Sequence, residues 1–80
     1  MTEEEIYSDV NKCFVKVLEH DQFELNDQTT ANDVDGWESI THMMIISEIE
    51  TTFAIKFKLM DLMNMNNVGD LIKAIQSEIS

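Results

Sequence analysis

The sequence predicts an all-α fold: a small bundle of four helices, three long and one short, with a long loop between the first and the second. The 80 residues include no proline and only two glycines, which favours helices over a turn-rich β fold. Apolar residues recur at spacings of three and four along most of the chain. Hydrophobic residues make up 44% of the sequence, enough for one core, so we expect residues 1–80 to form a single domain.

The first helix is expected from about Thr2 to Glu19. Thr2 and Glu5 have the spacing of a capping box, in which each side chain accepts from the other residue's backbone N–H. Cys13 lies in the apolar stripe and reads as a small core residue rather than a reactive thiol. With no second cysteine, a disulfide within the chain is excluded. The whole stripe comprises Ile6, Val10, Cys13, Phe14, Val17 and Leu18.

A polar connection of nearly twenty residues follows, from about His20 to Glu38. Loops of this length are usually functional or disordered. Its spaced apolar residues predict that it is pinned onto the helices; they are Phe23, Leu25, Val34 and Trp37. The run from Asn32 to Gly36 hints at a calcium loop. The template fails, because Ala31 stands at the first ligand position and His42 at the closing glutamate position.

The second helix is expected from Ser39 to about Thr52. Its buried stripe is predicted to contain Ile45, Ile49 and Phe53. A different face carries Ile40, Met43 and Ser47. Two apolar faces indicate either that this helix is central or that its second face meets a ligand or partner.

A brief helix from Leu59 to Met63 and a last helix capped by Asn67 complete the fold. The last helix has an apolar stripe of Val68, Leu71, Ile72, Ile75 and Ile79. Of the methionines, we expect Met60 and Met63 to fill the core, wholly or in part. Met43 and Met44 are expected to be partly exposed.

The net charge is −11, from 16 acids against five lysines. Such a surface repels nucleic acid and anionic lipid and attracts partners with basic patches. The alternative is that acidity only keeps a small protein soluble. Without a signal peptide or a long apolar run, the chain is expected to be soluble, cytoplasmic, monomeric and without stable membrane association.

Ser39 is the residue with the most informative setting. It opens a helix, where free backbone N–H groups and the helix dipole favour an anion, so a phosphate ester would suit this position. Ser39 and His42 are neighbours on the helix, but a hydrolase would need an orienting carboxylate and an oxyanion hole that the sequence does not supply. A plain helix cap is the other interpretation of this serine. The histidines and Cys13 do not have zinc-ligand spacing, so neither an enzyme nor a metal site is expected.

Three stretches resemble the acyl carrier protein family in the right order and spacing. Gly36-Trp37-Glu38-Ser39-Ile40 resembles the family's Asp-Ser-Leu attachment motif with two conservative replacements. Ile49-Glu50-Thr51-Thr52-Phe53-Ala54-Ile55 resembles the end of its second helix. Asn67-Val68-Gly69-Asp70-Leu71 is similar to the entry to its fourth helix. The resemblance covers essentially the whole chain.

The resemblance implies that Ser39 receives 4′-phosphopantetheine from coenzyme A, in a magnesium-dependent reaction of a phosphopantetheinyl transferase. The thiol of this arm would hold an acyl group as a thioester for loading and using enzymes with basic patches. The carrier would be a substrate of lipid, polyketide or related enzymes and not itself an enzyme.

Two further sets of residues are expected to serve this role. The partner-binding set is Glu38, Ile40, Met43, Met44, Ser47, Glu48 and Glu50. The acyl-pocket set is Ile45, Ile49, Ile55, Phe57, Met60, Met63 and Ile72.

Some positions depart from the family pattern. Met44 and Thr51 stand where glutamate is frequent, and Trp37 stands where housekeeping fatty-acid carriers usually have a small residue. These departures favour a specialised carrier. The alternatives are a peptidyl or aminoacyl carrier, or a helical adaptor of the same fold without the arm.

Overall fold

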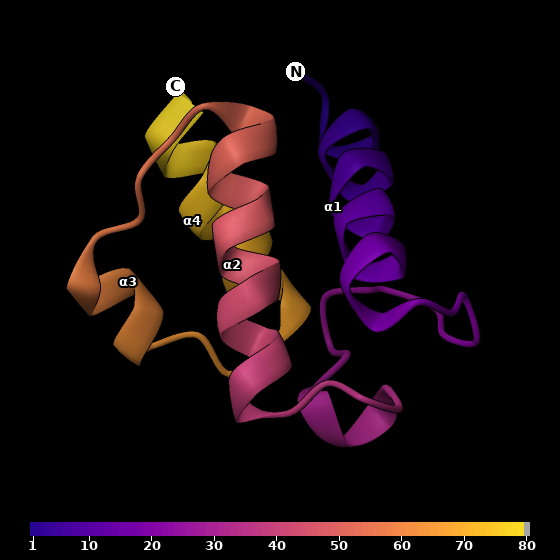
Figure 1. The fold of residues 1–80 in the computed structure, drawn as a ribbon. Helices are drawn as coiled ribbons and strands as arrows, with labels where there is room; N and C mark the ends of the chain where they lie inside the picture. Colours follow the sequence, from indigo (N-terminus) through magenta and orange to yellow (C-terminus); the bar gives the residue numbers. More distant parts are fainter. Residues whose placement is uncertain (80) are drawn as a thin grey trace.

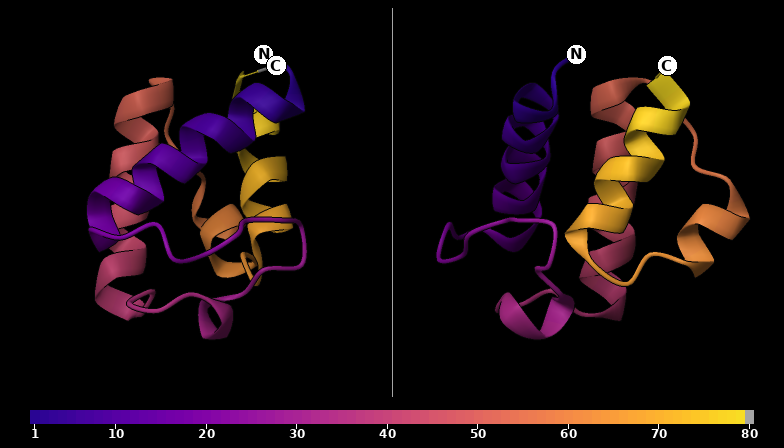
Figure 2. Two further views of the ribbon diagram at one scale, coloured as in Figure 1. Left: turned by 90° about the vertical axis from the view of Figure 1, so that its right-hand side faces the viewer. Right: turned by 180° about the vertical axis from the view of Figure 1, so that it is seen from behind.

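The computed structural model describes residues 1–79 and contains four α-helices and one short 3₁₀ helix. They are α1 (Glu3–Leu18), η1 (Ala31–Asp33), α2 (Ser39–Phe53), α3 (Leu59–Met63) and α4 (Val68–Ile79). α2 lies between α1 and α3 with α4 behind it (Figure 1). The left view of Figure 2 shows α1 crossing the α2–α4 pair obliquely. The predicted all-α architecture is confirmed, whereas η1 was not anticipated. Within residues 1–79, no helix is both long and apolar enough to span a bilayer.

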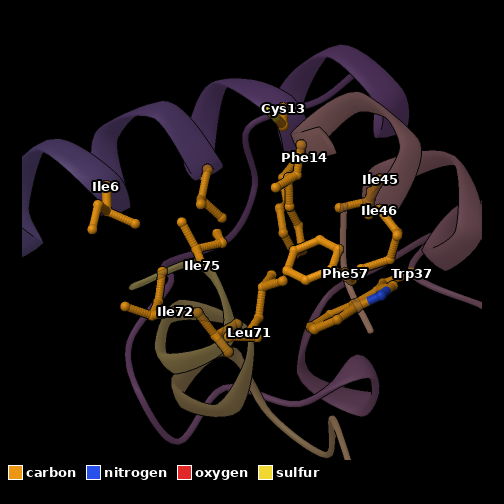
Figure 3. Close-up of a cluster of buried hydrophobic side chains, with 14 of the residues drawn as sticks. Ile6, Cys13, Phe14, Trp37, Ile45, Ile46, Phe57, Leu71, Ile72 and Ile75 are labelled. Atoms are coloured by element: carbon orange, nitrogen blue, oxygen red, sulfur yellow. The ribbon is translucent and has the colours of Figure 1, made fainter. Parts of the chain in front are cut away.

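One hydrophobic core lies between α1, α2 and α4 (Figure 3). The buried part of the α1 stripe matches the prediction, with Val17 and Leu18 half-buried at its end. Burial raises the pKa of the Cys13 thiol, as expected for a core residue. The core comprises Ile6, Val10, Cys13, Phe14, Val34, Trp37, Ile45, Ile46, Ile49, Phe57, Val68, Leu71, Ile72, Ala74 and Ile75.

Polar side chains close the helix ends as predicted at two places. Thr2 Oγ1 accepts from the Glu5 N–H at 3.2 Å, and the Glu5 carboxylate accepts from the Thr2 N–H at 2.8 Å. These hydrogen bonds lower the pKa of Glu5. At the start of α4, Asn67 Oδ1 accepts from the Asp70 N–H at 2.8 Å. Both helices therefore begin where their capping residues predict.

The first connection, residues 19–38, is pinned to the core as its apolar residues predict. Val34 and Trp37 are buried, and Phe23 and Leu25 are half-buried against the core. The Phe14 ring is the common anchor: its centroid lies 4.9 Å from that of Trp37 and 5.9 Å from that of Phe23. A connection that lacks regular structure over most of its length is thus held by aromatic packing.

Backbone hydrogen bonds also tie this connection to α4. The Val68 N–H donates to the Thr29 carbonyl at 2.8 Å, and the Gly69 N–H donates to the Asp27 carbonyl at 3.0 Å. A Cβ on Gly69 would lie 2.8 Å from the Asp27 carbonyl oxygen, closer than real contacts allow. Glycine is required here because the two backbones approach so closely.

The second connection, residues 54–67, carries α3 and is far less buried. Met60 and Met63 are 72% and 73% exposed, so the expectation that they fill the core is wrong. A helix of five residues can turn only one side inward. That side is occupied by Leu62, which packs against the core together with Met65. Consequently α3 presents its remaining apolar residues to solvent.

Candidate functional site

Ser39 is the first residue of α2, and its side chain is exposed. The residue in the N-cap position is Glu38, so the interpretation of Ser39 as a helix cap is wrong. Within residues 1–79, the Ser39 hydroxyl has no hydrogen-bond partner. The oxygen is therefore free to be modified.

Thr41 performs the local capping that Ser39 does not. Its Oγ1 accepts from the Glu38 N–H at 2.7 Å and donates to the Gly36 carbonyl at 2.5 Å. Gly36 has a positive φ of 85°, which a residue with a side chain adopts only with strain. The turn before α2 is thereby fixed by the Thr41 hydroxyl on one side and the buried Trp37 ring on the other.

The electrostatics of this helix start suit a covalent phosphate. The N–H groups of Ser39 and Ile40 lie in the first turn, where no carbonyl of the helix can accept from them. The dipole of the 15-residue α2 adds partial positive charge at the same place. A phosphodiester on Ser39 Oγ would lie at this end of the helix, so the residues present fit the group.

His42 lies one turn after Ser39 and is bonded to the preceding loop. Trp37 Nε1–H donates to His42 Nδ1 at 3.0 Å, and the two rings stack with centroids 5.9 Å apart. Half-burial of the imidazole lowers its pKa, which favours the neutral ring. The pair joins the core-anchored loop to the first turns of α2.

A hollow of about 330 Å³ opens beside Ser39. Its wall comes from η1, from the start of α2 and from the connection that leads into α4; the residues are Ala31, Trp37, Glu38, Ser39, His42, Met65, Asn66 and Asn67. A larger hollow of about 520 Å³, lined by residues of α1 and of the first connection, does not include Ser39. Only the smaller of these two hollows is lined by Ser39, the residue that the sequence singles out.

Four residues of the partner-binding set share one exposed face of α2. Ile40, Met43 and Met44 are 78%, 57% and 50% exposed, and Ser47 is exposed beside them. The expected exposure of Met43 and Met44 is thus confirmed. We call these four residues the α2 outer face.

The two later acids of the set lie on opposite flanks of that face. At 100° per residue, Glu48 and Glu50 point about 80° to either side of Ile40. Glu48 pairs with Lys16 of α1 at 2.7 Å. Glu50 Oε2 accepts from the Phe57 N–H at 3.0 Å and so holds the second connection. Both acids therefore have contacts within the fold, whereas Glu38 stands exposed next to Ser39.

The acyl-pocket set is divided by the structure. Ile45, Ile49, Phe57 and Ile72 are buried, and Ile55 packs against them half-buried. Met60 and Met63 face solvent and contribute nothing to the core. In this structure the five inward-facing members of the set are core residues.

Several residues of the site were not singled out from the sequence. Ala31, Met65 and Asn66 line the hollow, although nothing in the sequence indicates that they lie beside Ser39, and Met65 stands out there only as one of a group of methionines. The pairing of Trp37 with His42 was also missed. The only sequence signal for this pair was the spacing of five residues between an indole, which can only donate, and an imidazole, which can accept. That spacing predicts contact only once it is known that a helix begins between the two residues.

Comparison with known proteins assigns the chain to a family. A family model described as "Phosphopantetheine attachment site" matches residues 8–75. An acyl carrier protein of Exiguobacterium sibiricum is 27% identical over 79 residues, covering 99% of this chain and all of that protein. The solution NMR structure of a holo acyl carrier protein from Geobacter metallireducens superposes with a TM-score of 0.85 at 34% identity, over 92% of this chain and 85% of that one.

These matches confirm the predicted resemblance, the predicted phosphopantetheine cofactor and the prediction that the chain is not an enzyme. The chain therefore belongs to the acyl carrier protein family of phosphopantetheine-bearing, non-catalytic carriers.

Proposed function

We propose that Ser39 carries the 4′-phosphopantetheine arm and that the thiol of the arm holds acyl groups as thioesters. The observation that carries this proposal is the exposed Ser39 hydroxyl at the start of α2, which has no hydrogen-bond partner among residues 1–79 and lies inside the residues matched by the attachment family. In the loading reaction, Ser39 Oγ bonds to the phosphorus that bears pantetheine. The bond from that phosphorus to adenosine bisphosphate breaks, and the hydroxyl proton goes to a base of the transferase.

The mass of the chain after treatment with coenzyme A, magnesium and a broad-specificity transferase tests this site. Wild type should gain one phosphopantetheine and Ser39→Ala none. Ser8→Ala is the matched control, because it removes an exposed serine of α1, away from the α2 outer face, and should load normally. Since Ser39 is not the N-cap, Ser39→Ala should change stability by no more than about 0.5 kcal/mol, less than the loss of a true cap. A loaded Ser39→Ala chain would refute the assignment, and an unloaded wild type would favour the adaptor alternative.

We further propose that the α2 outer face and Glu38 meet the transferase and the acyl-handling enzymes. Apolar side chains exposed on a helix next to the modified residue suit an interface, and the charge of −11 favours partners with basic patches. Glu38 is the preferred probe of the charge because it is exposed beside Ser39, whereas reversal of Glu48 or Glu50 would break a contact with α1 or with the second connection.

The test compares loading rates of Glu38→Lys and of Glu4→Lys, an exposed acid at the start of α1. Glu38→Lys should slow loading more than Glu4→Lys, and the wild-type rate should fall as salt rises. Rates that respond to neither change would indicate that apolar contacts through Ile40, Met43 and Met44 dominate.

A specialised pathway, rather than housekeeping fatty-acid synthesis, is the finer part of the proposal. Support comes from Met44 and Thr51, which leave the outer side of α2 with fewer acids, and from the buried Trp37 beside the attachment site. Loaded chain should be a poor substrate for housekeeping elongation enzymes. Efficient elongation there would refute the specialised role.

The cargo separates an acyl carrier from a peptidyl or aminoacyl carrier. A linear acyl chain that enters the core beside Ile45 and Ile49 would remove methylenes from water at roughly 0.8 kcal/mol each, offset by opening the helices. Melting temperatures of holo chain and of a series of acyl lengths should therefore rise with length. Equal melting temperatures at every length would favour the aminoacyl alternative, whose polar cargo stays in solvent.

A further inference from the structure

We propose that His42 donates a hydrogen bond from Nε2–H to the phosphodiester on Ser39, and that Trp37 fixes the His42 ring in the tautomer that allows this. The proposal rests on the proposed function in one respect: the arm is attached to Ser39. It adds that Trp37 and His42 position the phosphodiester end of the arm toward the hollow beside α2.

The hydrogen bond between the two rings determines the tautomer. An indole nitrogen can only donate, so the 3.0 Å contact from Trp37 Nε1 requires His42 Nδ1 to be an unprotonated acceptor. In a neutral imidazole the proton then resides on Nε2. Half-burial lowers the pKa of His42 and keeps the ring neutral. His42 is thereby prepared as a neutral donor at Nε2.

That donor has no use within the fold. In the described part of the chain, His42 Nε2 has no hydrogen-bond acceptor. It is also not sealed from solvent, because none of the fully buried side-chain nitrogens and oxygens there lacks a partner. An accessible N–H on a ring held by stacking and by a hydrogen bond suits binding of an acceptor from outside.

The nearest new acceptor would be the phosphate on Ser39. Residues three apart on a helix are neighbours, and helical side chains lean toward the N-terminus, so His42 reaches back toward Ser39. Both residues line the same hollow. Among the described residues, no lysine lines this hollow, and Glu38 adds a carboxylate. A neutral donor at this point would offset part of the negative charge that the phosphodiester and Glu38 bring together.

The experiment follows imidazole ¹⁵N and phosphodiester ³¹P resonances in the apo and the loaded chain. The sequence contains only two histidines, so the His42→Phe variant, which removes one set of signals, assigns both. His20 is the internal control: its Nδ1 accepts from the Gln22 N–H and its Nε2 lies 2.7 Å from the Asp35 carbonyl, outside the hollow. We expect His42 to be the Nε2–H tautomer in both forms. Loading should shift His42 Nε2 and leave the His20 signals in place.

Three variants separate hydrogen bonding from packing. His42→Phe keeps a ring but has no donor, so the ³¹P resonance of its loaded form should move from the wild-type position. His42→Gln places an amide N–H at a similar reach and should restore most of that shift. Trp37→Phe retains His42 but frees its tautomer, so both tautomers should appear and the ³¹P resonance should move as well.

The outcomes distinguish the His42 contact from the attachment of the arm to Ser39, on which it rests. Absence of a mass increase on the wild-type chain would overturn the Ser39 assignment and the His42 contact together. A normal mass increase with unmoved His42 Nε2 signals would overturn only the His42 contact. The same holds if loaded His42→Phe and wild type have the same ³¹P resonance, because the pair would then only join the loop to the helix.

Discussion

The two connections that flank α2 are held in different ways. Residues 19–38 bury Val34 and Trp37 and supply carbonyls to the start of α4. Residues 54–67 bury Phe57 but leave Met60 and Met63 more than 70% exposed on α3. Segments with few buried contacts open at lower free-energy cost than core segments. The side that presents Ser39 is therefore fixed, and the α3 side is the one that can yield.

The largest test of this contrast is truncation of one apolar side chain in each connection. Trp37→Ala should lower the free energy of unfolding by about 3–5 kcal/mol, because it empties a core site and removes contact with Phe14. Met60→Ala should change it by no more than about 0.5 kcal/mol, since its side chain lies in solvent. Urea denaturation of both variants checks the difference. Equal losses would show that α3 packs as tightly as the first connection.

A smaller effect is expected where the first connection meets α4. Gly69→Ala should cost about 1–3 kcal/mol, because its Cβ would press on the Asp27 carbonyl and the backbone would have to move. This cost should exceed the gain of about 1 kcal/mol from replacing a helical glycine. Lys73→Ala, an exposed change on α4, is the control in thermal unfolding. A stabilised Gly69→Ala chain would mean that the close approach is not maintained in solution.

At the start of the second connection, a substitution at Ala54 is expected to increase stability. Ala54 ends α2 with a φ of 55°, in the left-handed region that costs a residue with a Cβ about 1–2 kcal/mol. Ala54→Gly should therefore raise the free energy of unfolding by up to about 1 kcal/mol, after the greater freedom of glycine in the unfolded chain is subtracted. Chemical denaturation measures it. A loss of stability would show that Ala54 is not held in this conformation.

The smallest predicted effect is a pH dependence at the Ser39 side. Burial lowers the pKa of His42 below that of the unfolded chain, so the unfolded state binds more protons in the interval between the two values. The stabilisation is present above about pH 6.5 and is lost as the pH falls through the folded-state pKa. Stability of wild type relative to His42→Gln should therefore decrease as the pH falls below about 6.5. A difference that stays constant with pH would contradict the burial of this imidazole.

The sequence predicts the helices better than it predicts the contacts between them. The Thr2 capping box and the stripe from Ile6 to Phe14 could be inferred because each depends on spacing within one helix. The exposure of Met60 could not, because a single helical turn carries no periodic signal that says which side is covered. The pairing of Glu48 with Lys16 was missed for a similar reason, since it depends on how α1 crosses α2.

The candidate site shows the same limit. Ser39 could be singled out from its position at the start of a helix and from the motif around it. The hollow beside it could not, because Met65 and Asn66 reach it only through the path of the second connection. The part of the wall beside Ser39 that Met65 and Asn66 form can therefore be identified only from the fold, because these residues are distant from Ser39 in the chain.

The capping role of Thr41 has a consequence for the regiochemistry of modification. Two hydroxyls lie within the first turn of α2, on Ser39 and Thr41, and an enzyme that brings an electrophile to this turn must choose between them. Thr41 Oγ1 already accepts from the Glu38 N–H and donates to the Gly36 carbonyl, so attack by it would break both bonds and loosen the turn. Ser39 Oγ can react without that cost. For the proposed attachment to Ser39, the fold thus leaves the Ser39 hydroxyl as the more available of the two, and the transferase need not discriminate between them by contact alone.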